Sequence, residues 1–317
     1  MEAVLIRIKY IISAVEHWLH KKLSFIVLPG FDGMPLYDVL VFFIRGLFRG
    51  VLTYRAAAIA FNFFLAIIPF ILFLFTLIPF VTSENYQADL LELMNELIPQ
   101  EIYMLAENTL VEIISRTSTG LLSVVFVMAI YFATNGVDAV LEGFGQSYHE
   151  IELWPWWKQK ITAFLLMSGI SILIFMAMAL LGFGKLTISI LTQQGLITSQ
   201  VTIFWLTTLR WLITIVFLLL SISVLYYFGQ PKDKKNRYRF FSPGSILSTT
   251  LFVGGGVLLK LYFENFARYN LLYGSIGSII ILLVWLYYNS FILLIGFELN
   301  TSIRQSKSEK TRYRVIE

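Results

Sequence analysis

The side chains that could carry chemistry fall into two groups: scattered histidines, and charged or amide groups inside apolar stretches. The chain has three histidines, His17, His20 and His149, and no cysteine. His17 and His20 are three residues apart, so on a helix they share a face that could hold a metal weakly, although a solvated face explains them more simply. Metal-dependent hydrolysis needs clustered ligands that activate water. The sequence therefore predicts no catalytic residue, no metal site and no cofactor.

The second group is polar side chains in or beside long apolar stretches. Its members are Arg55, Asn62, Asn135, Asp138, Glu142, Arg210, Asn289, Glu298 and Asn300. Such groups are costly at membrane depth and usually face protein or water. They indicate either an ion-paired clamp between helices or a polar pathway for a headgroup or ion, and we favour the clamp.

Spacing and depth relate several of these groups. Asn135, Asp138 and Glu142 share one helix face. Arg55, Asp138 and Glu298 lie at similar depth on three stretches, so we expect them to approach one another near the cytoplasmic end. Arg210 lies in the outer half of the fourth apolar stretch. There it either extends to the outer headgroups or points inward and holds an anionic substrate.

The elements that must position these residues are membrane helices. Of the 317 residues, 57% are hydrophobic and only 14% charged, far less charge than a soluble domain carries. About 20 apolar residues cross a bilayer. Six stretches qualify: 56–80, 121–141, 161–183, 201–228, 245–263 and 276–299. The sequence thus predicts an all-α, polytopic bundle of six transmembrane helices.

Lysine and arginine orient this bundle. They concentrate before the first stretch, in the second-to-third and fourth-to-fifth connections, and after the last stretch. Because cytoplasmic connections are enriched in these residues, the sequence predicts a bacterial inner (plasma) membrane protein with both termini in the cytoplasm. The basic run 232–239 is explained by this topology, so we expect anionic lipid headgroups as partners and no nucleic acid. A protein partner or a second copy stays open.

Three regions follow from these patterns. Residues 1–53 contain two amphipathic stretches, 4–18 and 36–51, that either lie in the interface or pack under the bundle; 29–33 predicts a turn. Residues 54–303 form the membrane domain, with an outer helical cap at 82–120. Residues 304–317 form a basic cytoplasmic tail. Tryptophans 154, 156 and 157 are typical of an aromatic belt.

Proline and glycine mark places where helices bend or meet. Pro69 predicts a kink in the first span. Glycines cluster in the last two spans: Gly254, Gly255, Gly256, Gly274, Gly277 and Gly296. Small residues let helix backbones approach closely. Close packing is the simpler interpretation, and a hinge is the alternative.

These motifs resemble the YihY/virulence factor BrkB family. The resemblance covers roughly residues 45–302. It rests on AAAIAF at 56–61 followed by Pro69, PG at 243–244, YGSIG at 273–277, WLY at 285–287 and GFELN at 296–300. The chain departs from the pattern at Asn62, where the family often has an aromatic residue, and at 66–68. The resemblance implies six spans with cytoplasmic ends.

The resemblance also implies candidate functions, because the family has carried ribonuclease, virulence-factor and envelope lipid-transport labels. It transfers no catalytic residue. The shortage of histidine argues against a nuclease, and the chain has no ATP-binding loop. Polar groups and candidate hinges on several spans favour a non-enzymatic protein that moves lipids or other amphiphiles across or within the envelope. A non-transporting scaffold for envelope assembly is the alternative.

Overall fold

The chain folds into helices packed along their lengths. The structure, a computed structural model, describes residues 21–49, 51–81, 119–147, 154–194, 199–230, 239–265 and 275–316. Within these ranges there is no strand, which confirms the all-α prediction. The principal helices are α2 (Leu36–Arg49), α3 (Leu52–Val81), α6 (Thr119–Gly145), α7 (Trp156–Gln193), α8 (Gln200–Phe228), α9 (Pro243–Asn265) and α11 (Ser275–Ile316).

Five of the six predicted spans correspond to helices long and apolar enough to cross a membrane. These are α3, α6, α7, α8 and α11. The remaining one, α9, has a shorter apolar stretch, Pro243–Leu259, so the helices establish a membrane bundle without fixing its number of crossings at six. α11 continues unbroken to Ile316, and most of the predicted tail is therefore helical. α3 likewise continues through Pro69.

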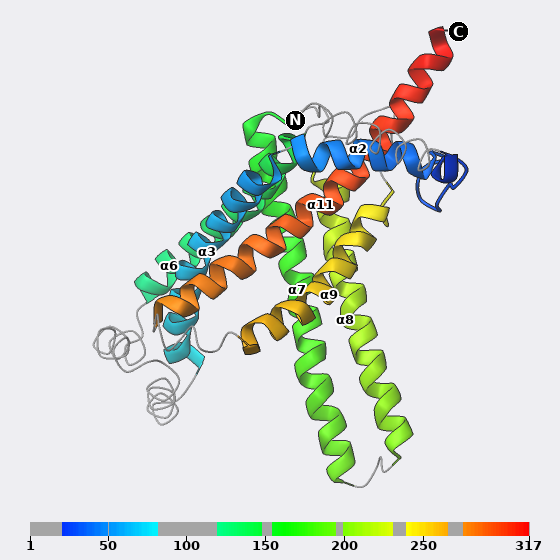
Figure 1. Cartoon of the computed structure of the whole chain (residues 1–317). Coiled ribbons are helices and arrows are strands. Elements are labelled where there is room, and N and C mark those ends of the chain that lie inside the picture. The colour runs from blue at the N-terminus through cyan, green and yellow to red at the C-terminus, as the bar shows by residue number, and fades with distance from the viewer. Residues whose placement is uncertain are drawn as a thin grey trace.

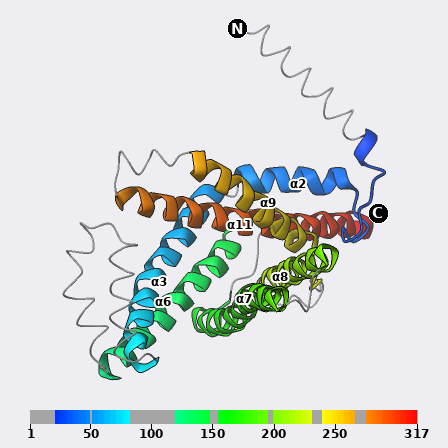
Figure 2. The same ribbon diagram turned by 90° about the horizontal axis from the view of Figure 1, so that it is seen from below.

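The helices associate in pairs. α3 packs along α6, α7 along α8, and α9 along α11, while α11 also crosses α3. Figure 1 shows α7 and α8 extending together away from the α3–α6 pair, and Figure 2 shows the two pairs from below. α2 lies across the end of the bundle, against α11. The chain segments that the charge pattern assigns to the cytoplasm meet at this end; which side of the membrane it faces stays a prediction.

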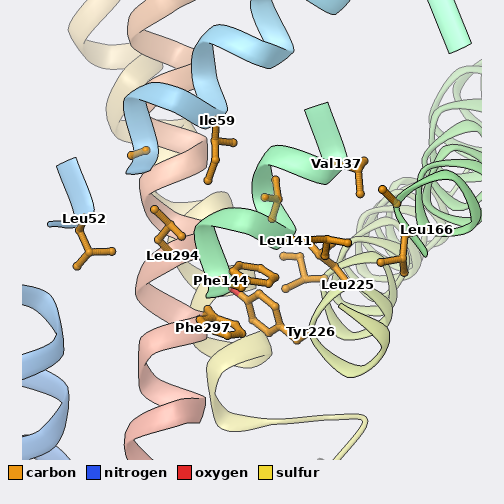
Figure 3. Packing of buried hydrophobic residues seen from close by; sticks show 14 residues of the cluster. Leu52, Ile59, Val137, Leu141, Phe144, Leu166, Leu225, Tyr226, Leu294 and Phe297 are labelled. Carbon is orange, nitrogen blue, oxygen red and sulfur yellow. The ribbon is translucent and has the colours of Figure 1, made fainter. Parts of the chain in front are cut away.

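The best packed part of the core lies near this end. Phe144 of α6 stacks on Phe297 of α11 with ring centroids 3.9 Å apart, and Tyr226 of α8 meets Phe144 edge-on (Figure 3). Ile59 and Leu294 complete the contact between α3 and α11. Many other large apolar side chains are exposed, as expected of helices whose solvent is lipid.

The second amphipathic stretch combines both interpretations offered for it. Val39 of α2 is buried and packs with Ile303 of α11, Phe31 and Met34, whereas Phe48 is 85% exposed. One side of α2 therefore packs against the bundle and the other remains available to the interface.

The predicted turn at 29–33 is confirmed. Gly30 and Gly33 both have positive φ, which glycine adopts without strain. A Cβ on Gly30 would also lie only 2.9 Å from Pro243, at the start of α9. Asp32 in this turn pairs with Arg239, just before α9, and with Lys307, in the C-terminal part of α11.

Several predictions fall outside the described residues: the first amphipathic stretch, nearly all of the outer cap, the three histidines, and Gly274. Trp156 and Trp157 are exposed at the start of α7, as belt residues would be. Trp154 packs against the core instead.

Candidate functional site

A buried ion pair ties three helices together at the packed end. Arg55, at the start of α3, donates from Nη1 to Glu298 Oε1 on α11 over 2.7 Å. Its Nε donates to the carbonyl oxygen of Gly143 on α6 over 2.8 Å. The other carboxylate oxygen of Glu298 accepts a bond from Ser147 over 2.8 Å. The two side chains are 3% and 0% exposed, so the expected approach of Arg55 to Glu298 is found.

Asp138 does not join this pair as expected. It pairs with Lys160 of α7 at 2.6 Å and accepts a bond from Gln159. Matched depth does not set the direction in which a side chain points. Gly143 lies five residues after Asp138, which turns the helix by about 140°. Asp138 therefore faces α7, while Gly143 faces α3 and α11.

The other members of the polar face divide in the same way. Asn135 accepts a bond from Lys160 over 2.9 Å, so it shares the α6–α7 contact with Asp138. Glu142 is exposed and lies 3.5 Å from the amide of Gln146. Asn62 and Asn289 each donate to the carbonyl four residues earlier on their own helix, which satisfies them locally.

Two further predicted residues, Asn300 and Gly296, lie where α9 crosses α11. Asn300 accepts from the Gly244 N–H over 2.8 Å and donates to Ser242 Oγ over 2.9 Å. Nearby, a Cβ added to Gly296 would overlap Ser248 Oγ and approach the hydroxyl of Tyr226. Tyr226 itself bonds Ser248 and the carbonyl of Leu293. Here glycine permits close packing.

The remaining glycines behave differently from one another. A Cβ on Gly255 would overlap the Tyr288 hydroxyl, so this position is also closely packed. Gly254 and Gly256 have open space where a Cβ would stand. Gly277 is buried. Close packing therefore applies to only part of the glycine cluster.

Arg210 points between α7 and α8. Its Nη1 donates to the Leu181 carbonyl over 3.3 Å, and its Cδ would lie 2.9 Å from a Cβ on Gly184. Its Nε is buried without a hydrogen-bond partner in the described part of the chain. The side chain thus lies against α7, which favours neither of its two predicted roles.

A cavity of about 480 Å³ occupies the middle of the bundle. Its walls come from α3, α6, α7, α8, α9 and α11, the six helices that correspond to the predicted spans. On α6 the wall follows one helix face, through Ala129, Ala133, Val137 and Val140. Alanine at the first two positions leaves room that a larger side chain would fill.

The lining of this cavity is almost wholly apolar. Ser171 and Ser221 are its hydroxyl-bearing members among the described residues, and each bonds within its own helix, to Met167 Sδ and to the Phe217 carbonyl. Apart from the indole N–H of Trp285, these walls therefore offer a polar ligand little hydrogen bonding. An apolar cavity of this kind excludes water and accepts apolar ligands.

Sequence reasoning missed the cavity and several polar residues. Gln159 and Lys160 were not identified as partners of Asp138. The Ser242–Ser245 pair caps α9 reciprocally, each backbone N–H donating to the other's hydroxyl over 3.1 Å. Two serines three residues apart around Pro243 and Gly244 are close to a capping-box signal that could have revealed it. Gln230 was also missed, because nothing in the sequence marks a glutamine beyond a helix end.

Together the bundle and its cavity define a multi-pass helical membrane protein. Residues 44–315 match the family model described as virulence factor BrkB. The chain belongs to this family, as its motifs indicated.

Curated relatives agree with this assignment. The ribonuclease-like protein YfkH of Bacillus subtilis (strain 168) is 27% identical over 80% of this chain and 90% of its own length. A UPF0761 membrane protein of Coxiella burnetii (strain Dugway 5J108-111) is 24% identical over 81% of this chain and 90% of its own length. A UPF0761 membrane protein of Psychromonas ingrahamii is 35% identical over 22% of this chain and 23% of its own length. No solved structure matches the chain.

Proposed function

We propose that this protein binds the apolar chains of lipids or other amphiphiles in its central cavity and moves them within or across the membrane. The observation that carries the proposal is the cavity of about 480 Å³ whose walls come from six helices. Because its hydroxyl groups are already bonded, an acyl chain is the occupant that its chemistry suits best. Acyl chains are also the most abundant apolar ligands around a membrane protein.

A polar seam between α6 and α7 is the proposed place for the headgroup. Asp138 follows the wall residue Val137 directly, and Lys160 lies seven residues before the wall residue Met167, about 10 Å along α7. The Lys160 side chain is 45% exposed. Its ammonium group can therefore also bond a lipid phosphate while it stays beside Asp138, whose own side chain is only 14% exposed.

Two other functions are less well supported. The relative YfkH is named ribonuclease-like, but no group of three or more metal-ligating side chains occurs among the described residues. Protein freed of soluble nucleases is expected to leave tRNA intact. Cleavage that disappears in His17→Ala, His20→Ala or His149→Ala would reverse this conclusion. A scaffold for envelope assembly would leave the cavity without a role.

A vesicle assay separates the proposal from the scaffold. Protein is reconstituted with a fluorescent phospholipid, and bilayer crossing is followed with a membrane-impermeant reductant. We expect faster crossing than in empty vesicles, and a loss of most of this increase in Ala133→Phe, which fills the cavity. Ala57→Phe, at an exposed position of α3 away from the cavity, is the matched control. No acceleration by the wild-type protein, or equal rates in both variants, would overturn the proposal.

A further inference from the structure

A second cavity, of about 610 Å³, lies between the beginning of α7 and the end of α8. Its described walls are apolar on one side, with Leu165, Leu166, Val224 and Phe228. The remaining lining residues are Trp154, Thr162 and Gln230, which bring an indole N–H, a hydroxyl and a carboxamide. The core residue Leu166 also packs within the main cluster. This cavity is thus amphipathic, unlike the central one.

Gln230 is the unusual member of this lining. It lies just beyond the end of α8 and is only 2% exposed. Neither its Nε2 nor its Oε1 has a hydrogen-bond partner among the described residues. A buried polar group without a partner is costly, and such a group in a native protein calls for an explanation, for example a bound water or ion. A donor and an acceptor are therefore presented together in a cavity.

The surroundings of the cavity indicate which ligand could satisfy this carboxamide. Leu165 and Phe228 are exposed on the outer surface of the helices, so two of the walls continue into the lipid-facing surface. In the sequence, Gln230 is followed by Lys232, Lys234 and Lys235, a basic run of the kind that attracts anionic headgroups. The ligand must therefore have an apolar chain and a polar part with both donors and acceptors, at headgroup depth.

We propose that this cavity is a phospholipid-binding site in which the Gln230 carboxamide bonds the polar, ester-bearing part of the lipid. The chain lies along Leu165, Val224 and Phe228. The site stands independently of the proposed function, because a lipid held here needs neither to enter the central cavity nor to move.

Thermal unfolding in detergent tests this site. The protein is purified in an alkyl maltoside, which carries no ester or phosphate, and phosphatidylglycerol is added in mixed micelles. A ligand that binds only the folded state raises its melting temperature with concentration. Gln230→Leu removes the carboxamide and keeps the bulk. Ser223→Ala is the matched control, since Ser223 is a buried residue of α8 outside the lining whose hydroxyl has no partner in the described part of the chain.

The expected result is a lipid-dependent rise in wild type and in Ser223→Ala. In Gln230→Leu, the lipid concentration for the half-maximal rise should increase at least about tenfold, the factor that 1.4 kcal/mol of lost bonding produces. Without lipid this variant should be no less stable, since it removes an unsatisfied group. Should it fail to fold, Leu165→Trp narrows the cavity from α7 and should weaken the rise similarly. An equal rise in wild type and the cavity variants, or no rise in wild type, would overturn the proposal.

Discussion

At the end of the bundle beside α2, aromatic rings stack at 3.9 Å and an ion pair is fully enclosed, whereas the middle of the same helices surrounds a cavity of about 480 Å³. α3, α6, α8 and α11 contribute to both regions. The packed end uses charge, glycine and aromatic residues to hold helices at fixed positions. The lining of the hollow middle contains no charged residue or glycine among the described residues, and its alanines leave space between larger apolar and aromatic side chains. This difference suggests that the packed end holds the helices in place while the middle receives a ligand.

The largest effect is expected from breaking the enclosed ion pair. Glu298→Gln keeps the shape of the side chain but removes the negative charge that Arg55 faces, and breaking a buried pair costs about 3–5 kcal/mol. Thermal unfolding in detergent and the yield of folded protein should both fall sharply. The double variant Arg55→Met with Glu298→Leu removes both charges and should recover part of the loss. A melting temperature unchanged in Glu298→Gln would show that the pair does not hold the packed end together.

A smaller loss is expected at the crossing of α9 and α11. Gly296→Ala introduces a Cβ that would overlap Ser248 Oγ, and overpacking of this kind costs about 1–3 kcal/mol. Gly254→Ala is the matched control in the same glycine cluster, because its Cβ would enter open space. Its stability should be unchanged or higher, since glycine inside a helix is less favourable than alanine by about 0.5–1 kcal/mol. Equal melting temperatures for the two variants would contradict the distinction between packed and open glycines.

The smallest effect on stability is expected at the polar seam between α6 and α7. Asp138→Asn removes the ion pair with Lys160, whose side chain is 45% exposed. Exposed pairs contribute about 0–1 kcal/mol. Although the Asp138 side chain is only 14% exposed, asparagine keeps an acceptor oxygen for Gln159 and Lys160, so the melting temperature should fall less than in the two destabilised variants above. If the seam receives a headgroup, however, crossing of labelled phospholipid in vesicles should change although the protein stays folded. A loss of folded protein as large as in Glu298→Gln would assign Asp138 to the clamp instead.

Sequence reasoning predicted elements better than contacts. Hydrophobic stretches predicted six spans, and five of them are helices of spanning length, whereas the apolar part of α9 is shorter. Depth correctly paired Arg55 with Glu298 but wrongly added Asp138, because depth along a helix leaves the angle around it undetermined. The cavity could not be predicted, since it depends on how far the α7–α8 pair lies from α3 and α6. Periodicity carries no information about such distances.

Photocrosslinking of a lipid chain tests the central claim most directly. A phospholipid with a diazirine in its acyl chain is incorporated into membranes with the protein, activated by light, and mapped by peptide mass spectrometry. The account predicts adducts on cavity residues such as Met167 and Phe252, and their selective loss in Ala133→Phe, while adducts on the exposed Phe204 persist. Adducts confined to exposed residues, or unchanged by Ala133→Phe, would contradict it.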